Sequence, residues 1–195
     1  MTEKRQLIIN AAVEVIAEHG YHGAQVSRIA KQAGVADGTI YLYFKNKDDI
    51  LFGMFEYKVD QLMAAMEQTL TAASSPEEQL KIFVRNHVEW LALDQSLAAC
   101  VQLELRQSKK EMRNRLNHLL IPYHRLLEEI LVKGIEARVF DDAMNLKFAR
   151  QLVFGAIDEA VSTWVVADFK YDILSQFDDL YYLINKAVAK ESSND

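Results

Sequence analysis

Thr39, Tyr41 and Tyr43 place three hydroxyl groups in a short stretch near the N-terminus, and Lys47 follows them. Hydroxyl groups can exchange hydrogen bonds with the edges of nucleic-acid bases without burying a charge. On a helix with about 100° per residue and Ile40 on its inner side, these three residues occupy the flanks. Lys47 lies beside the start of the next helix, whose first amide groups favour phosphate. The chemistry open to these residues is hydrogen bonding to a nucleic acid.

Two short helices joined by a tight turn are expected to position these groups. The first carries an apolar stripe at helical spacing, made of Val26, Ile29, Ala30 and Ala33. Gly34 follows where a left-handed residue would end that helix. The second helix runs from about 37 to 44, with Ile40 and Phe44 inward. Such a pair is typical of a helix-turn-helix unit, whose second helix enters the DNA major groove, although a helical hairpin within an all-α core has the same pattern.

The run GVADGTIYLYFKNKDDIL, at residues 34–51, resembles the DNA-binding signature of TetR-type repressors. Residues 24–30 fit the segment that precedes this signature, so the resemblance covers roughly residues 5–55. It implies an all-α protein with a three-helix head, residues 1–47, and a larger helical body for effector binding and dimerisation, residues 48–195. The DNA-contacting residues that it implies are Ser27, Arg28, Gly38, Thr39, Tyr41, Leu42, Tyr43 and Lys47.

Two positions in the signature depart from the usual family pattern. Asp37 stands where a basic or small residue is common, and its charge should weaken contact with phosphate. Leu42 stands where a polar side chain is common, and it could contact a thymine methyl group instead of donating to a base.

Longer runs in the body resemble the fatty-acid-degradation repressors of the same family. These runs are QLELRQS, at residues 102–108, and ARQLVFGAIDEAVSTWV, at residues 149–165. The resemblance implies a long-chain acyl-CoA as effector and no cofactor. A planar or cationic drug-like effector, as in efflux repressors, is the competing interpretation.

Composition supports an all-α chain without a membrane-spanning segment. Half of the 195 residues are hydrophobic, whereas Gly (7) and Pro (2) are scarce, which leaves few residues for hairpin turns. The single cysteine, Cys100, cannot form an internal disulfide. Because no apolar run approaches the roughly 20 residues that span a bilayer, and because a secretory signal is missing, we expect a cytoplasmic protein.

The charge distribution is unusual for a nucleic-acid-binding protein. The formal net charge is −6, and the first 50 residues carry as many acidic as basic side chains. A basic surface is the usual electrostatic signature of DNA binding. Here the arrangement of charges must compensate, because Lys45 and Lys47 cluster at the end of the second short helix.

Hydrophobic periodicity and capping residues predict the remaining helices. Ser75 and Pro76 should start one of them, as N-cap and first helical residue. Pro122 falls inside a continuous apolar stripe and should kink the helix there. The predicted helices span residues 3–19, 48–71, 76–91, 95–107, 112–136, 146–167 and 171–189.

A basic cluster and several internal aromatic side chains are the candidates for an effector site. The cluster, Arg106, Lys109, Lys110, Arg113 and Arg115, could grip the phosphates of coenzyme A or could be a solvated helix face. His87 and Trp90 lie on an apolar face and could equally be core residues. The candidate ligand-binding residues are Phe83, His87, Trp90, Gln102, Arg106, Lys109, Arg113, Tyr123, Arg150, Phe154 and Trp164.

The two C-terminal helices carry apolar residues on more than one face, which indicates a homodimer that buries them in a four-helix bundle. A twofold dimer suits a pseudo-palindromic DNA operator. No phosphate-binding glycine loop, nucleophile elbow or zinc-ligand spacing is present, so no enzyme is expected, and Asp158 and Glu159 are interpreted as polar contacts. A ligand-responsive repressor is therefore favoured over an all-α lipid-binding or enzymatic protein with an incidental helix-turn-helix.

Overall fold

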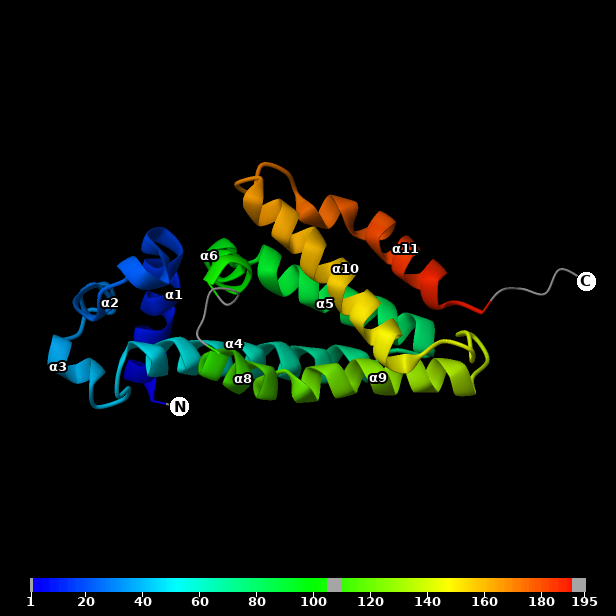
Figure 1. The fold of residues 1–195 in the computed structure, drawn as a ribbon, viewed down its shortest axis with the longest axis horizontal. Coiled ribbons are helices and arrows are strands. Elements are labelled where there is room, and N and C mark those ends of the chain that lie inside the picture. Colours follow the sequence, from blue (N-terminus) through cyan, green and yellow to red (C-terminus); the bar gives the residue numbers. More distant parts are fainter. Residues whose placement is uncertain (1, 105–109, 191–195) are drawn as a thin grey trace, which may run out of the picture. The chain divides into compact units, whose positions relative to one another are not determined.

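The computed structural model describes residues 2–104 and 110–190, and the predicted all-α architecture is confirmed (Figure 1). An isolated antiparallel bridge joins Phe140 to Ala189. The elements in chain order are α1 (Glu3–Gly23), α2 (Val26–Gln32), α3 (Asp37–Ile40), α4 (Lys47–Leu70), α5 (Pro76–Ala92), α6 (Gln95–Ala99), the π-helix η1 (Cys100–Glu104), α8 (Lys110–Leu119), α9 (Ile121–Glu136), α10 (Leu146–Val166), the 3₁₀ helix η2 (Ile173–Gln176) and α11 (Phe177–Val188).

The chain folds as two compact units. The first unit combines Met1–Asp60 with Asp94–Leu119, and the second combines Gln61–Leu93 with Leu120–Asp195. The contacts therefore place α6 and α8 in the same unit as the N-terminal helices. The predicted boundary between residues 47 and 48 divides the chain by function, into a DNA-binding head and an effector-binding body. This division stays a prediction.

In the first unit, α1 packs against α2, α6 and η1. Its inner face buries Ile8, Ile9 and Ile16, and the thiol of Cys100 donates a hydrogen bond to the carbonyl of Val13 at 3.4 Å. Gly20 was expected to end this helix. It leaves the helical conformation, with φ 70° and ψ 160°, and one further turn of helix continues beyond it. That combination of angles is almost restricted to glycine.

The helix-turn-helix forms as predicted, with a shorter second helix. Gly34 ends α2 at φ 67°. The α-helical part of α3 stops at Ile40, where residues 37–44 had been expected to be one helix. Beyond it the backbone tightens into hydrogen bonds between residues three apart, such as Tyr43 N–H to the Ile40 carbonyl at 3.0 Å. These 3₁₀-type bonds keep the chain close to a helical path up to Phe44.

The second unit packs α5, α9, α10 and α11 around one core. The Ser75 hydroxyl accepts from the amide of Glu78 at 3.2 Å, which confirms the predicted N-cap of α5. The whole apolar stripe of that helix is buried, including Phe83 and His87. Among the described residues, no helix is both long and apolar enough to cross a bilayer.

Three helix predictions need correction. A single kinked helix was expected over residues 112–136, but α8 ends at Leu119 and Pro122 lies in the first turn of α9, where its missing N–H is not needed. The helix expected over 95–107 becomes a π-helix after Ala99. The last helix begins as a 3₁₀ turn, and its N-cap is Asp172, whose carboxylate accepts from the amide of Leu174 at 3.0 Å.

Candidate functional site

The predicted inner side of residues 37–44 is confirmed, whereas Tyr41, which was expected on a flank, is exposed. Ile40 and Phe44 are buried, whereas Leu42 is 80% and Tyr41 59% exposed. Thr39 and Tyr43 are half-buried on the flanks. Beyond its chain neighbours and its own helix backbone, no atom of the part of the chain that the structure describes lies within 4 Å of a Cβ built on Gly38, so another backbone could come close to this point. The outer face therefore presents a small residue, an apolar side chain and hydroxyl groups.

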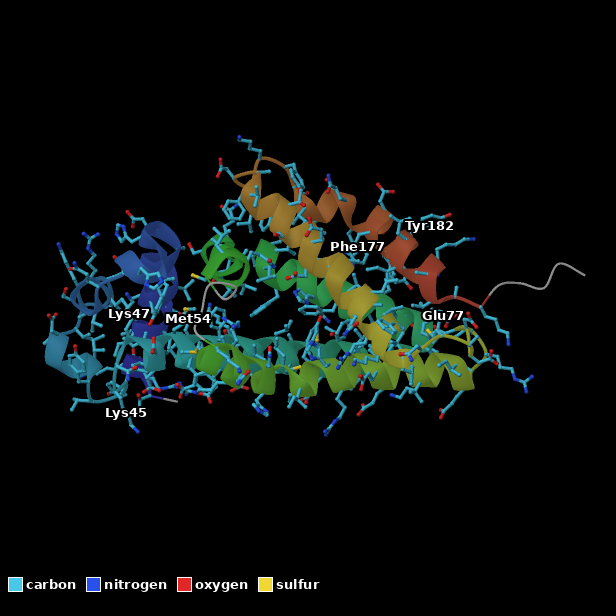
Figure 2. All side chains as sticks on the ribbon, in the orientation of Figure 1. Lys45, Lys47, Met54, Glu77, Phe177 and Tyr182 are labelled. Carbon is cyan, nitrogen blue, oxygen red and sulfur yellow. The ribbon has the colours of Figure 1, made fainter. Side chains whose placement is uncertain are left out.

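Lys47 lies in the first turn of α4, close to the C-terminal part of α1 (Figure 2). Its Nζ is 4.5 Å from the centre of the Tyr21 ring and donates to the His22 carbonyl at 3.2 Å. The Tyr21 hydroxyl in turn donates to the Asp48 carboxylate. Burial, and then this contact with Asp48, raises the pKa of Tyr21, so its hydroxyl stays a donor. The ammonium group is therefore held by an aromatic face and a carbonyl.

Asn46 caps α4. Its side-chain oxygen accepts from the Asp49 amide at 2.9 Å, and the Asp49 carboxylate accepts from the Lys45 amide at 3.0 Å. The Lys45 side chain itself is exposed, and Figure 2 shows it on the connection between α3 and α4. These reciprocal hydrogen bonds determine where α4 begins.

Two further predicted contact residues lie on α2. Ser27 and Arg28 are both exposed, and Arg28 Nη1 lies 2.8 Å from Nε2 of His19 on α1. All eight predicted DNA-contacting residues thus belong to one compact unit. Their contact with bases or phosphates stays a prediction.

A second candidate site lies in the core of the second unit, where a histidine and a tyrosine pair inside an aromatic cluster. His87 Nδ1 is 2.6 Å from the Tyr123 hydroxyl, and both side chains are buried. Phe83 packs against the Tyr123 ring at 4.8 Å between ring centres. The ring centre of Phe154 lies 6.2 Å from that of His87, and the ring centre of Trp90 lies 6.3 Å from it. Helices α5, α9 and α10 each contribute to this cluster.

Burial keeps the polar pair of this cluster neutral. It lowers the pKa of His87 to about 4, although the Asp158 carboxylate acts in the opposite direction. Burial also raises the pKa of Tyr123 well above its ordinary value, and Asp158 adds to that change. Neutral His87 and Tyr123 can each satisfy the other, with the tautomer of the ring setting which one donates.

An ion pair borders the cluster. Arg150 Nη1 lies 3.3 Å from the Glu128 carboxylate, and His124 packs edge-on against Phe154 at 5.5 Å. Burial, and then the charge of Arg150, lowers the pKa of His124, while Glu128 opposes this. His124, Glu128 and the influence of Asp158 on His87 were missed as site features, because helical spacing alone does not show which faces of three helices meet.

The structure brings together some of the eleven candidate ligand-binding residues and separates others. Phe83, His87, Trp90, Tyr123 and Phe154 form the cluster, and Arg150 borders it. Trp164 instead packs on Phe169, with its Nε1 donating to the Tyr171 carbonyl at 2.7 Å. Gln102 and Arg113 belong to the first unit, and Arg106 and Lys109 lie outside the described residues.

The described part of the basic cluster lies on α8, in the first unit. Lys110 and Arg113 are exposed, and the Arg115 guanidinium lies 3.8 Å from the centre of the Phe52 ring on α4. This contact gives Arg115 a structural role in addition to any ligand contact. Within residues 2–104 and 110–190, no group of three or more His, Cys, Asp or Glu side chains could hold a metal ion.

An exposed helix-turn-helix on an otherwise helical chain is the architecture of a one-component DNA-binding regulator. Residues 8–54 match the family model described as "Bacterial regulatory proteins, tetR family", and residues 55–187 match the one described as "YsiA-like protein, C-terminal region". The chain belongs to the TetR family of bacterial regulatory proteins and is a DNA-binding transcriptional regulator.

Relatives with similar sequences cover almost the whole chain. The fatty acid metabolism regulator protein of Bacillus subtilis (strain 168) is 49% identical over 172 residues, which is 88% of this chain and 89% of that protein. The fatty acid degradation regulator FadR of Bacillus halodurans has a similar fold, with a TM-score of 0.89 and 47% identity, covering 92% of this chain and 97% of that one. FadR of Bacillus subtilis, solved in complex with stearoyl-CoA, has the same score and identity over 92% and 96%.

Proposed function

We propose that this protein represses genes of fatty-acid degradation and leaves its operator when a long-chain acyl-CoA binds. The observation that carries the proposal is the 47% identity, over 92% of this chain, to a regulator that was solved with stearoyl-CoA. The exposed side chains on and just after α3 support the part of the proposal that concerns operator binding. Because bacterial DNA lies in the cytoplasm, the proposal places the protein there, and it includes no catalytic step.

The aromatic cluster of the second unit supports the effector half. Its apolar members, Phe83, Trp90 and Phe154, offer contacts that suit an acyl chain. The polar pair, His87 and Tyr123, can hydrogen-bond a carbonyl group if one partner turns toward it. Arginine's planar fork matches phosphate oxygens, so Arg150, which borders the cluster, is its proposed anchor for coenzyme A. Arg113 stays a predicted ligand-binding residue of the first unit, and Arg106 and Lys109 stay predictions outside the described residues.

The proposed assembly is a homodimer through α10 and α11. These helices lie side by side (Figure 1), and large apolar side chains stay exposed on them in a single chain. The exposed residues are Phe148 (67%), Leu152 (47%), Val166 (71%), Tyr182 (63%) and Leu183 (65%). Pairing across a twofold axis would cover this surface and present two α3 helices to half-sites about one helical turn apart.

Asp158 favours one alternative effector class. A carboxylate that acts on His87 and Tyr123 resembles the arrangement expected for a cationic, drug-like ligand. Isothermal titration calorimetry distinguishes the two classes when acyl-CoAs of increasing chain length are compared with free coenzyme A and cationic dyes. We expect affinity to rise with chain length. Equal affinities for all lengths, or tight binding of the dyes alone, would contradict the acyl-CoA proposal.

Operator release is tested separately. A DNA duplex selected in vitro from a random library by the purified protein should have two related half-sites. Fluorescence anisotropy should then show that a saturating long-chain acyl-CoA weakens binding roughly 5- to 150-fold, which corresponds to a coupling of about 1–3 kcal/mol. If free coenzyme A released the duplex equally well, the acyl chain would have no part in regulation.

A further inference from the structure

The segment His19–His22 surrounds a bend in the chain and contacts two cations of the DNA-binding unit. Gly20 leaves the helix at φ 70° and ψ 160°, so the residues on its two sides follow different helical registers. His19, before the bend, contacts Arg28 on α2. Tyr21 and His22, after the bend, contact Lys47 on α4. These three residues are not among the eight predicted DNA-contacting residues.

The contacts of Lys47 restrict its ammonium group from two directions. A ring face lies 4.5 Å from Nζ, and the His22 carbonyl accepts a hydrogen bond at 3.2 Å. The ring cannot rotate freely, because the Tyr21 hydroxyl donates to Asp48, the residue that follows Lys47. The side chain of a lysine otherwise samples many rotamers, and ordering them opposes binding.

The contact of Arg28 restricts its guanidinium in a similar way. An arginine N–H can only donate, so His19 Nε2, 2.8 Å away, must be the acceptor and must be unprotonated on this nitrogen. The same nitrogen lies 3.7 Å from the Glu18 carboxylate. Arg28 is exposed, so its remaining donors can reach a ligand in solvent.

We propose that His19 and Tyr21 are positioning residues for DNA binding, holding Arg28 and Lys47 ready for the phosphate backbone before DNA arrives. The proposal rests on the DNA-binding function of the chain and deepens it. An aromatic face attracts a cation without neutralising it, so the contact with Tyr21 itself takes no charge from Lys47. The Nε2 atom of His19, as an acceptor, does the same for Arg28. A carboxylate in either place would cancel the charge that phosphate binding needs.

The test of Tyr21 is a double-mutant cycle with Lys47, using the full chain and the selected duplex at several salt concentrations. The salt slope is the slope of the logarithm of the binding constant against the logarithm of the salt concentration. Lys47→Ala should lower its magnitude by about one per half-site. Tyr21→Leu should weaken binding roughly 2- to 5-fold per half-site, the worth of an exposed cation–π contact. Its salt slope should move toward that of Lys47→Ala, and the double variant should lose no more than Lys47→Ala alone.

The ring-preserving variant Tyr21→Phe is the matched control, and it should keep the salt slope of the parent. Fully additive losses in the double variant would overturn the proposal. A Tyr21→Leu variant with weaker binding but an unchanged salt slope would also overturn it, because a general loss of structure does not remove a single phosphate contact selectively.

A second experiment tests His19 without changing Tyr21, so it remains informative if Tyr21→Leu folds poorly. His19→Gln keeps a side-chain acceptor for Arg28, whereas His19→Ala removes it. We expect His19→Ala, but not His19→Gln, to weaken binding, and Arg28→Ala to abolish the difference between the two. Equal binding by both variants, or a difference that persists without Arg28, would overturn the role of His19. If Lys47→Ala and Arg28→Ala both bind like the parent, the proposal fails while repression itself stands.

Discussion

A histidine and a tyrosine can share the apolar core of the second unit because each satisfies the other. His87 and Tyr123 are 36 residues apart in the chain, and their contact at 2.6 Å is buried. An unpaired polar group in this place would carry the full free-energy cost of losing its water. The pair is therefore a polar point inside an apolar cluster, and a ligand that takes one partner must also satisfy the other.

Stability should depend on pH through His87. Burial lowers its pKa from 6.5 in the unfolded chain to about 4, so between these values the unfolded chain binds a proton that the folded chain does not. The stability that comes from keeping His87 neutral is fully present above about pH 6.5, and it is lost as the pH falls toward 4. The loss should reach about 3 kcal/mol. Urea unfolding at a series of pH values measures it, with His87→Gln flattening the dependence and leaving the smaller part from His124, whose pKa is also lowered.

Removing the Tyr123 hydroxyl should destabilise the protein. Tyr123→Phe leaves His87 Nδ1 without its partner in a dry environment, so we expect a loss of about 1–3 kcal/mol in the free energy of unfolding. Tyr181→Phe is the matched control, because its hydroxyl donates to the Glu77 carbonyl at 2.8 Å in a half-buried place that water can reach. Chemical denaturation should show the smaller loss for the control, and equal losses would contradict the account of the buried pair.

Among the helices, the two glycines of the DNA-binding region should respond to alanine in opposite ways. Gly34 has φ 67°, so Gly34→Ala strains the turn and should cost about 1–2 kcal/mol. Gly38 is helical with open space around it, so Gly38→Ala should stabilise the protein by about 0.5–1 kcal/mol. Thermal unfolding measures both effects. Anisotropy should still show weaker DNA binding for Gly38→Ala, because a methyl group would then stand on the face that meets DNA.

Helix starts that depend on local hydrogen bonds were predictable from the sequence. Ser75 accepts from an amide three residues on, as its position before a hydrophobic run indicated, and Asn145 makes the same hydrogen bond at the start of α10. Pro122 was harder, since a proline inside an apolar stripe fits both a kink and a new helix. The outcome depends on Leu120, whose backbone angles of φ −85° and ψ −3° interrupt the helix just before it.

For the whole molecule, the exposed apolar face of α10 and α11 predicts the oligomeric state. Replacing Leu183 by glutamate puts a charge into the proposed interface, so Leu183→Glu should convert a dimer to a monomer and abolish high-affinity operator binding. Sedimentation velocity measures the first effect and anisotropy the second. Leu93→Glu is the control: Leu93 is 86% exposed but lies outside both helices, and its replacement should leave the dimer intact. A parent protein that sediments as a monomer would contradict the assembly.

Gly155 offers a second test of that face. Apart from its chain neighbours and the backbone of α10, no described residue has an atom within 4 Å of a Cβ built there, although Gly155 lies in the middle of that helix. In a lone chain, Gly155→Ala should be mildly stabilising. If the partner's helix packs closely at this point, the same change should weaken the dimer, and sedimentation at decreasing protein concentration will show whether it does.

What the sequence alone determined are the properties that depend on neighbours within a few positions. The apolar stripe of α2, the turn at Gly34 and the cap at Ser75 arise from contacts between residues one to four apart, so spacing predicts them. The class of protein was indicated by the resemblance of residues 34–51 to the TetR-type signature, because the local pattern alone also fits a helical hairpin. Tertiary structure alone decided that His87 meets Tyr123 and that Tyr21 lies against Lys47. Each of these pairs joins two helices, and the rotation of one helix against another depends on how the whole core packs.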